Sequence, residues 1–140
     1  MTKQYFQVHP DDIDAHWGLL SSLIKKAIDK TNNADYTVEG LYNRIKSNYV
    51  QLFVVIEDDE LNSIFITSVV PYDISSYLHV CLTVVVDGKK GDYSYWLDCF
   101  KEVAKLFNCN KISLTGRKGW GRFASRFNFK SETTHVTEIN

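Results

Sequence analysis

The stretch that decides the fold is YLHVCLTVVVDGKKGDYSYWLDCFKEVAKLFNCNKISL, residues 77–114. It opens with a run of strong β-formers, Tyr77–Val86, which stops at a turn with two glycines, Asp87–Gly91. Apolar residues then recur at helical spacing, namely Trp96, Cys99, Phe100, Val103 and Phe107. Another short strand, Lys111–Thr115, follows and is closed by Gly116. Such a strand–helix–strand unit predicts two parallel strands joined by a right-handed crossover.

The residues before this unit predict a short strand, two helices and an antiparallel meander. After Gln4–Val8, the segment His9–Asp12 indicates a helix start, with a proline in the first turn and acids near the positive end of the helix dipole. The first helix carries one apolar stripe, formed by Trp17, Leu20, Ile24, Ala27 and Ile28. Thr37 is the predicted cap of a second helix with Leu41, Tyr42 and Ile45 on one face. Strands are expected at Val50–Ile56, Ser63–Val70 and Tyr77–Val86, the first of them covered on both faces.

A short helix, Lys118–Phe127, and a final strand, Lys130–Ile139, complete the chain. The predicted order is β-α-α-β-β-β-α-β-α-β, in one α/β domain with a mixed sheet over residues 1–140. Such a sheet must splay where its antiparallel half meets the parallel pair, and we expect a ligand cleft at that place.

Composition narrows the classes of protein that fit. The chain is 44% hydrophobic and 24% charged, as an ordinary folded domain is, and its formal net charge of −1 disfavours nonspecific binding to nucleic acid. No apolar run of about 18 residues is present, so no membrane span is expected. The odd number of cysteines and the absence of C-x-x-C spacing favour free thiols in a reducing compartment.

The most specific similarity to known proteins lies in residues 104–129. A helix end with the sequence AKLFNC leads into the strand KISL, then into GRKGWGRF and FNF. With the element order, this run resembles the GNAT superfamily of N-acetyltransferases over essentially the whole chain, and in particular small GNAT-like proteins encoded by bacteriophages. The resemblance implies a GNAT fold, acetyl-CoA as the cofactor, and a protein in the cytoplasm of a bacterial host that is incorporated into a virion or associated with particle proteins.

In active GNAT enzymes the turn after the fourth strand holds an R/Q-x-x-G-x-G/A signature, whose N–H groups receive the pyrophosphate of acyl-CoA. The matching turn here, Asp87–Asp92, keeps two glycines and two lysines but lacks the signature, and its terminal acids bring charge of the wrong sign. Two interpretations stay open, a polar loop in which Asp92 caps the next helix and a working pyrophosphate cradle. For the cradle, the resemblance implies as cofactor-binding residues Val84, Val86, Gly88, Lys89, Lys90 and Gly91.

Catalytic residues are weakly indicated. Many family members protonate the leaving thiolate with a tyrosine on the last short helix, and by count from Asn128 and Phe129 the residue here is Ala124. Alternation along Tyr77–Val86 predicts that His79, Cys81 and Thr83 share one face. His79 is the candidate base, with a satisfied strand histidine as the simpler interpretation. Cys81 is a candidate nucleophile, disfavoured because no base is identifiable beside it.

Two further groups of residues have both a functional and a simpler interpretation. A basic patch suits the CoA 3′-phosphate, nucleic acid or an acidic protein, but equally a solvated helix face; it consists of Arg117, Lys118, Arg122 and Arg126. Acids and histidines cluster near the first helix, where capping is favoured over a metal site; they are His9, Asp11, Asp12, Asp14 and His16. No metal site is predicted.

Two hypotheses about function follow. The altered turn and the missing tyrosine slightly favour a catalytically degenerate protein that acts by binding or as a virion-associated structural component. The alternative is an acetyl-CoA-dependent N-acetyltransferase acting on an amine, with catalysis mainly by proximity and orientation. An open slot between the fourth and fifth strands favours the enzyme, whereas Trp120 or Phe123 filling that slot favours the scaffold.

Overall fold

A computed structural model describes residues 2–31, 35–114, 126, 129–130 and 137–139. The elements in chain order are β1 (Lys3–Gln7), a 3-10 turn (Pro10–Asp12), α1 (Ile13–Thr31), α2 (Val38–Lys46), β2 (Val50–Glu57), β3 (Glu60–Pro71), β4 (Ser76–Val85), α3 (Tyr93–Leu106) and β5 (Lys111–Leu114). This order is the predicted one up to residue 114. The helix and the strand predicted at 118–127 and 130–139 fall largely outside the described residues.

The five strands form one mixed sheet in the order β1-β2-β3-β4-β5. The predicted antiparallel meander, β2 to β4, and the predicted parallel pair, β4 and β5, are both confirmed. Strand β1, for which no partner was predicted, pairs antiparallel with β2. Strand β3 begins at Glu60, three residues earlier than expected, because Asp58 and Asp59 form a two-residue turn. Both have positive φ, 52° and 66°, which Asp tolerates and which lets Glu57 pair directly with Glu60.

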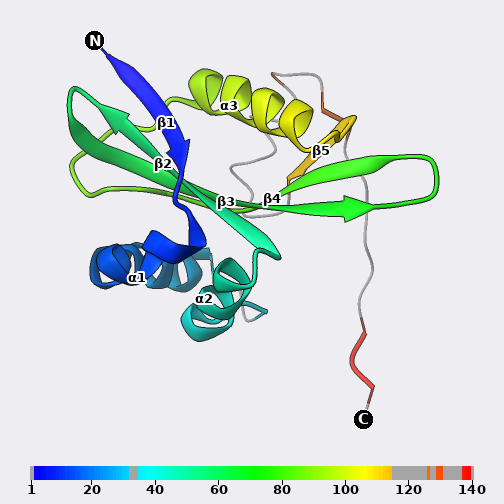
Figure 1. The fold of residues 1–140 in the computed structure, drawn as a ribbon, viewed down its shortest axis with the longest axis horizontal. Coiled ribbons are helices and arrows are strands. Elements are labelled where there is room, and N and C mark those ends of the chain that lie inside the picture. Colours follow the sequence, from blue (N-terminus) through cyan, green and yellow to red (C-terminus); the bar gives the residue numbers. More distant parts are fainter. Residues whose placement is uncertain (1, 32–34, 115–125, 127–128, 131–136, 140) are drawn as a thin grey trace.

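Helices cover both faces of the sheet, with α1 and α2 on one face and α3 on the other (Figure 1). Strand β2 supplies alternate residues to the two layers, so the prediction of a strand covered on both faces is confirmed. Leu52 and Val54 pack in the core cluster of α1 and α2, whereas Phe53 and Val55 pack under α3. Phe65 is the centre of the second cluster, with its ring 4.9 Å from that of Phe53 and 5.0 Å from that of Phe100.

A bulge in β4 changes the side-chain alternation. Ile66 pairs with Leu82, whereas the next residue of β3, Thr67, pairs with Val80, so Cys81 is one extra residue in β4. Both Cys81 and Leu82 consequently pack on the side of α1 and α2.

The bulge corrects the prediction that three polar residues of this strand share one face. His79 pairs with Ser68 on the side of α1 and α2, and so stays on the face of Cys81. Thr83 pairs with Phe65, which packs under α3. The prediction is therefore wrong for Thr83, because an extra residue reverses the alternation beyond it.

The three cysteines, Cys81, Cys99 and Cys109, are free and buried. Within the described residues, no helix is both long and apolar enough to cross a membrane.

Candidate functional site

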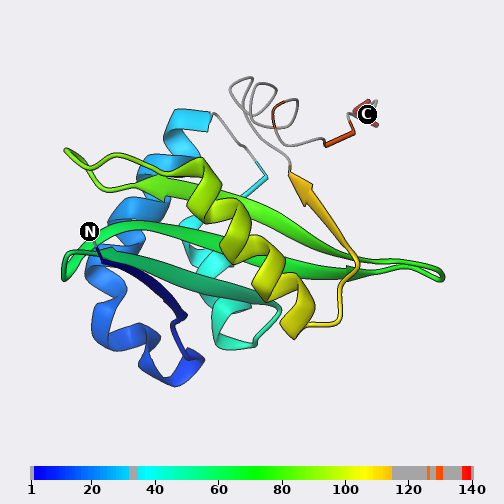
Figure 2. The ribbon, with the colours of Figure 1, turned by 90° about the horizontal axis from the view of Figure 1, so that it is seen from above.

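The described part of β5 pairs with β4 over its whole length, Lys111–Leu114. Their register runs from Tyr77–Lys111 to Val80–Leu114, whereas β4 continues to Val85. Figure 2 shows β5 as the last described strand at this edge of the sheet, next to β4. Within the described part of the chain, the second half of β4 therefore has a strand partner on one side only, and its other edge carries unpaired backbone groups.

The backbone groups on this open edge can be identified from the ladder. Val86 donates its N–H to the carbonyl of Asn62 at 2.9 Å. Because hydrogen-bonding residues alternate along an antiparallel ladder, Val84 also directs its N–H and C=O toward β3. The groups of Thr83 and Val85 then face the open edge, and the Val85 carbonyl indeed accepts a bond from Lys26 Nζ at 3.1 Å instead of from β3.

The turn after β4 is held by contacts within the chain. Gly88 has φ +81°, a conformation that glycine adopts without strain. Gly91 packs so tightly that a Cβ would lie 3.0 Å from Val85 Cγ2 and 3.3 Å from the Trp96 ring. The carbonyl of Lys90 accepts a bond from Asn62 Nδ2 at 3.1 Å, and the side chain of Lys89 pairs with Glu60.

Asp92 is the N-cap of α3, as predicted. Its carboxylate accepts the N–H of Tyr95 at 3.1 Å and lies 2.5 Å from Lys3 Nζ. The Lys3 ammonium holds the pKa of Asp92 below its ordinary value, so a negative charge stands at the helix end where a phosphate would bind. Asp87 at the other end of the turn pairs with Lys26, which likewise lowers its pKa. Each acid at the ends of the turn is thus neutralised by a lysine from elsewhere in the chain.

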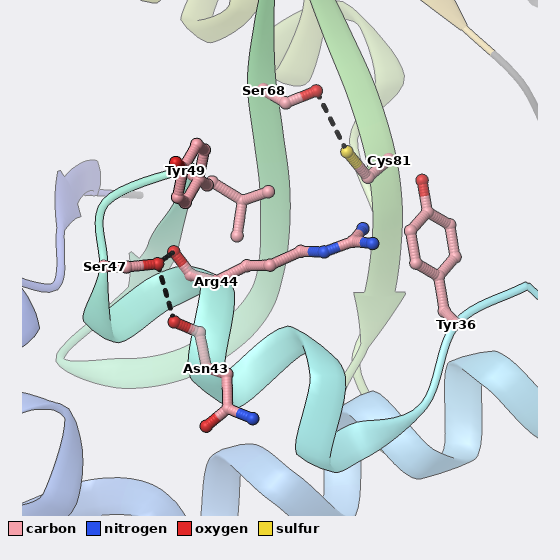
Figure 3. Close-up of a pocket in the computed structure, with 8 residues that line it drawn as sticks. Tyr36, Asn43, Arg44, Ser47, Tyr49, Ser68 and Cys81 are labelled. Carbon is pink, nitrogen blue, oxygen red and sulfur yellow. Dashed lines mark hydrogen bonds between the residues drawn. The ribbon is translucent and has the colours of Figure 1, made fainter.

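A cavity of about 520 Å³ lies on the α1/α2 side of the sheet, close to the bulge (Figure 3). Its walls come from the segment before α2, from α2 itself, from the segment leading into β2, and from β3 and β4. The lining residues are Tyr36, Asn43, Arg44, Ser47, Tyr49, Val50, Ser68 and Cys81.

Tyr36, Arg44 and Cys81 converge in this cavity. The Arg44 side chain extends from α2 toward the strands, and its guanidinium ends between the Tyr36 ring and β3 and β4 (Figure 3). Within the described part of the chain, Arg44 makes no ion pair. Burial raises the pKa of Tyr36 to about 12, with a further contribution from Cys81, so the phenol is neutral at physiological pH.

The Cys81 thiol is also kept neutral. Burial raises its pKa above the ordinary value, and this outweighs the opposing effects of Ser68, Tyr36 and the Arg44 charge. Its sulfur lies 3.5 Å from the Ser68 hydroxyl oxygen. A protonated thiol is a poor nucleophile, so this environment disfavours the nucleophilic interpretation of Cys81.

His79 lies at the parallel end of β4, two residues before the bulge. Its Nδ1 is 2.8 Å from Ser113 Oγ on β5, and the two residues are direct partners in the parallel ladder. The ring is half-buried, and burial lowers the pKa of His79 below 6.5, which favours the neutral imidazole. A neutral imidazole can accept a proton, but His79 is not among the residues that line the cavity.

The remaining predicted residues are largely separate from this site. Arg126 is exposed, while the rest of the predicted basic patch lies outside the described residues, namely Arg117, Lys118 and Arg122. Ala124 also lies outside them, as do Trp120 and Phe123, either of which would favour the scaffold if it filled the slot. Whether the slot between the fourth and fifth strands is open or filled therefore stays a matter of prediction.

The cluster near the first helix has structural contacts. His9 accepts the N–H of Asp11 as the cap of the 3-10 turn, and Asp14 binds Tyr42 and Lys46. Among the described residues, no three His, Cys, Asp or Glu side chains are grouped as metal ligands.

Tyr36, Arg44 and Ser68 are site residues that sequence reasoning missed. They belong to three different segments of the chain, and no local sequence pattern identifies any of them as a site residue. The nearest signal is Arg44 itself, which stands beside the apolar stripe of α2, directly before the buried Ile45.

Solved structures that are similar to this chain over nearly its whole length include several acetyltransferases. No protein-family model matches the sequence, and no curated protein matches it significantly. A predicted acetyltransferase of Clostridium acetobutylicum with acetyl-CoA has a TM-score of 0.71 and 16% identity over 99% of this chain and 96% of that one. A ribosomal-protein-alanine N-acetyltransferase of Brucella melitensis has a TM-score of 0.71 and 14% identity over 99% and 100%. A GNAT family acetyltransferase of Staphylococcus aureus has a TM-score of 0.65 and 18% identity over 100% of both chains. The chain therefore has the fold of GNAT acetyltransferases.

Proposed function

We propose that this protein is an acetyl-CoA-dependent N-acetyltransferase that acts on a small amine. The observation that carries the proposal is that β4 continues beyond its last described pair with β5, Val80–Leu114, directly beside the cavity at Cys81. Among the described residues, strand groups without a ladder partner and a cavity thus meet at one place, which is what transfer between an extended thioester and a separate acceptor requires. Solved acetyltransferases with this fold add support, one of them with acetyl-CoA.

The open edge of β4 fits the extended pantetheine part of acetyl-CoA. A chain with amide groups can pair with a free strand edge, as peptides do when they add to a sheet. The alternation of the ladder favours Thr83 and Val85 for this pairing, one residue away from the Val84 and Val86 implied by the resemblance. The pyrophosphate would then lie at Gly88–Gly91, with Lys89 and Lys90 as its cations.

The acceptor amine would lie in the cavity near Cys81. Acetyl-CoA supplies the activated acetyl group; the amine nitrogen forms a bond to the carbonyl carbon as the carbon–sulfur bond breaks. The amine loses one proton and the departing thiolate takes one up, so the overall reaction needs no further reactant. His79, held neutral and oriented by Ser113, is the proposed acceptor of the amine proton, directly or through water.

A second function is favoured by one observation, the Asp92 carboxylate at the N-terminus of α3. A carboxylate at this helix end, already paired with Lys3, takes the position that a phosphate would use, as expected for a GNAT scaffold retained for binding alone. A more specific hypothesis is that this scaffold is a virion-associated protein related to phage-encoded GNAT-like proteins. That hypothesis rests on the sequence resemblance of residues 104–129. Most of that run after residue 114 lies outside the described residues, so this reading stays a prediction.

Calorimetric titration with acetyl-CoA tests the first proposal. We expect saturable binding that is lost in Gly88→Trp, because the indole would occupy the turn. Release of free CoA thiol in the presence of an amine panel would then establish transfer. Absence of heat and of thermal stabilisation at millimolar acetyl-CoA would reject the enzyme in favour of the scaffold.

A further inference from the structure

The cavity beside Cys81 contains one positive charge that forms no ion pair with any described residue. Arg44 is in no ion pair within the described residues, whereas the neighbouring cation of the same helix, Lys46, binds Asp14 at 3.1 Å. Its guanidinium is directed into the cavity and does not lie along the helix surface (Figure 3). A planar fork of donors in this position matches the geometry of a carboxylate.

The other cavity walls are neutral. The Cys81 thiol and the Tyr36 phenol both stay protonated, and Ser47, Ser68 and Asn43 carry no charge. No carboxylate lines the cavity among the described residues, so nothing in its wall competes with a ligand for Arg44. The charge of the site is therefore that of one arginine.

Two tyrosines line the cavity together with the arginine. In Figure 3 the guanidinium end of Arg44 points toward Tyr36, and Tyr49, which is 76% exposed, lies nearer the other end of the side chain. Rings in this position offer flat faces to an apolar or aromatic group without adding charge. A cavity of about 520 Å³ has room for a ligand the size of an amino acid or a short peptide end.

We propose that this cavity binds a small molecule with a carboxylate, that Arg44 holds the carboxylate, and that Tyr36 and Tyr49 favour an aromatic side chain. The next step rests on the proposed function: if the protein is an acetyltransferase, its acceptor is an α-amino acid or a related amino carboxylate. The carboxylate binds Arg44, and the amine reaches the bulge at Cys81. Arg44 is a specificity residue in this scheme and takes no part in proton transfer.

Measuring the binding of amino acids in the absence of acetyl-CoA tests carboxylate recognition by Arg44 separately from catalysis. The probes are the proteinogenic L-amino acids and the matching amino-acid amides, each added at millimolar concentration to the isotope-labelled full chain. The readout is the movement of the backbone amide resonances of Ser68 and Cys81. We expect saturable movement with aromatic amino acids and binding about tenfold weaker for their amides, which lack the charge.

Three variants identify the residue responsible. Arg44→Gln should weaken amino-acid binding by about tenfold or more and abolish the preference over amides, and Arg44→Lys should keep part of it. Lys46→Gln removes the same charge two residues away on the same helix and should leave binding unchanged. Circular dichroism checks that α2 is intact in each variant.

The results separate this proposal from the enzyme proposal. Binding that depends on Arg44 supports the carboxylate site even if acetyl-CoA does not bind. Transfer from acetyl-CoA to amines without any preference for the carboxylate overturns the site but leaves the enzyme. No saturable shift with any amino acid, or equal binding by Arg44→Gln, also overturns it.

Discussion

Lys3 at the start of β1 forms an ion pair of 2.5 Å with Asp92, the residue that caps α3. The pair joins the first strand to the helix end that follows the glycine turn. It also determines the charge at that helix end. In a GNAT acyltransferase the N-terminus of this helix would lie next to a phosphate of the cofactor. Here the Asp92 carboxylate lies at the helix N-terminus, and the Lys3 ammonium balances its charge.

Asp92→Asn should strengthen the binding of acetyl-CoA. Asparagine caps a helix as well as aspartate does, so α3 keeps its start, while the opposing charge is removed and Lys3 is released toward phosphate. We expect a dissociation constant lower by several-fold in calorimetry at low salt. The control is Asp29→Asn, which removes a carboxylate from the exposed pair with Lys25 on α1. Unchanged or weaker binding in Asp92→Asn would place the phosphate elsewhere.

His79 should make the protein less stable in mild acid. Its pKa is lowered by burial, so below the ordinary value of 6.5 the unfolded chain binds a proton that the folded chain does not. Stability present above that value is therefore lost progressively as pH falls below about 6.5 and through the lowered pKa of the folded state. Urea unfolding should show a smaller loss over this interval for His79→Gln. An identical loss in the variant would mean that other groups account for the acid sensitivity.

The two glycines of the turn should respond differently to alanine. At Gly91 a Cβ would crowd Val85 and Trp96, which we expect to cost about 1–3 kcal/mol. At Gly88 the added Cβ meets no atom within 4 Å, so the cost is the positive φ alone, about 1 kcal/mol. Urea midpoints should therefore rank wild type above Gly88→Ala and Gly88→Ala above Gly91→Ala. The reverse order would contradict the packing at Gly91.

A buried hydrogen bond joins α3 to the sheet and can be measured by a double-mutant cycle. Trp96 Nε1 donates to Ser63 Oγ at 3.1 Å, and both residues are buried. Ser63→Ala leaves the indole N–H unpaired and should cost about 1–3 kcal/mol. The double variant Ser63→Ala with Trp96→Phe should be less destabilised than the sum of the two single changes. Simple additivity would show that the bond contributes nothing.

Local patterns predicted most of the fold because each element has its own periodicity. The stripe of α3 is an example, since Trp96, Cys99, Phe100 and Val103 are all buried. The cap residues Thr37 and Asp92 were identified for the same reason, because a cap acts within one turn of its helix. The antiparallel meander and the parallel pair followed from rules about connections between strands.

The bulge and the cavity were beyond sequence reasoning for two physical reasons. Every residue around Cys81 is a plausible strand former, so the sequence does not reveal which residue is left unpaired in the bulge. Thr83 was assigned to the wrong face of the sheet for this reason. The cavity depends on Arg44 and Tyr36 reaching Ser68 across the sheet, which is a matter of tertiary packing. Sequence reasoning found Cys81 in this site but not the residues around it.

The contact between Trp96 and Gly91 has a consequence for spectroscopy. A buried indole emits at a wavelength and intensity set by its immediate surroundings, and here those surroundings include the glycine turn. With Trp17 and Trp120 replaced by phenylalanine, fluorescence would come from Trp96 alone. Any ligand that moves the turn would then change the emission of the unlabelled protein, so that occupancy can be followed in real time, without a dye and without turnover.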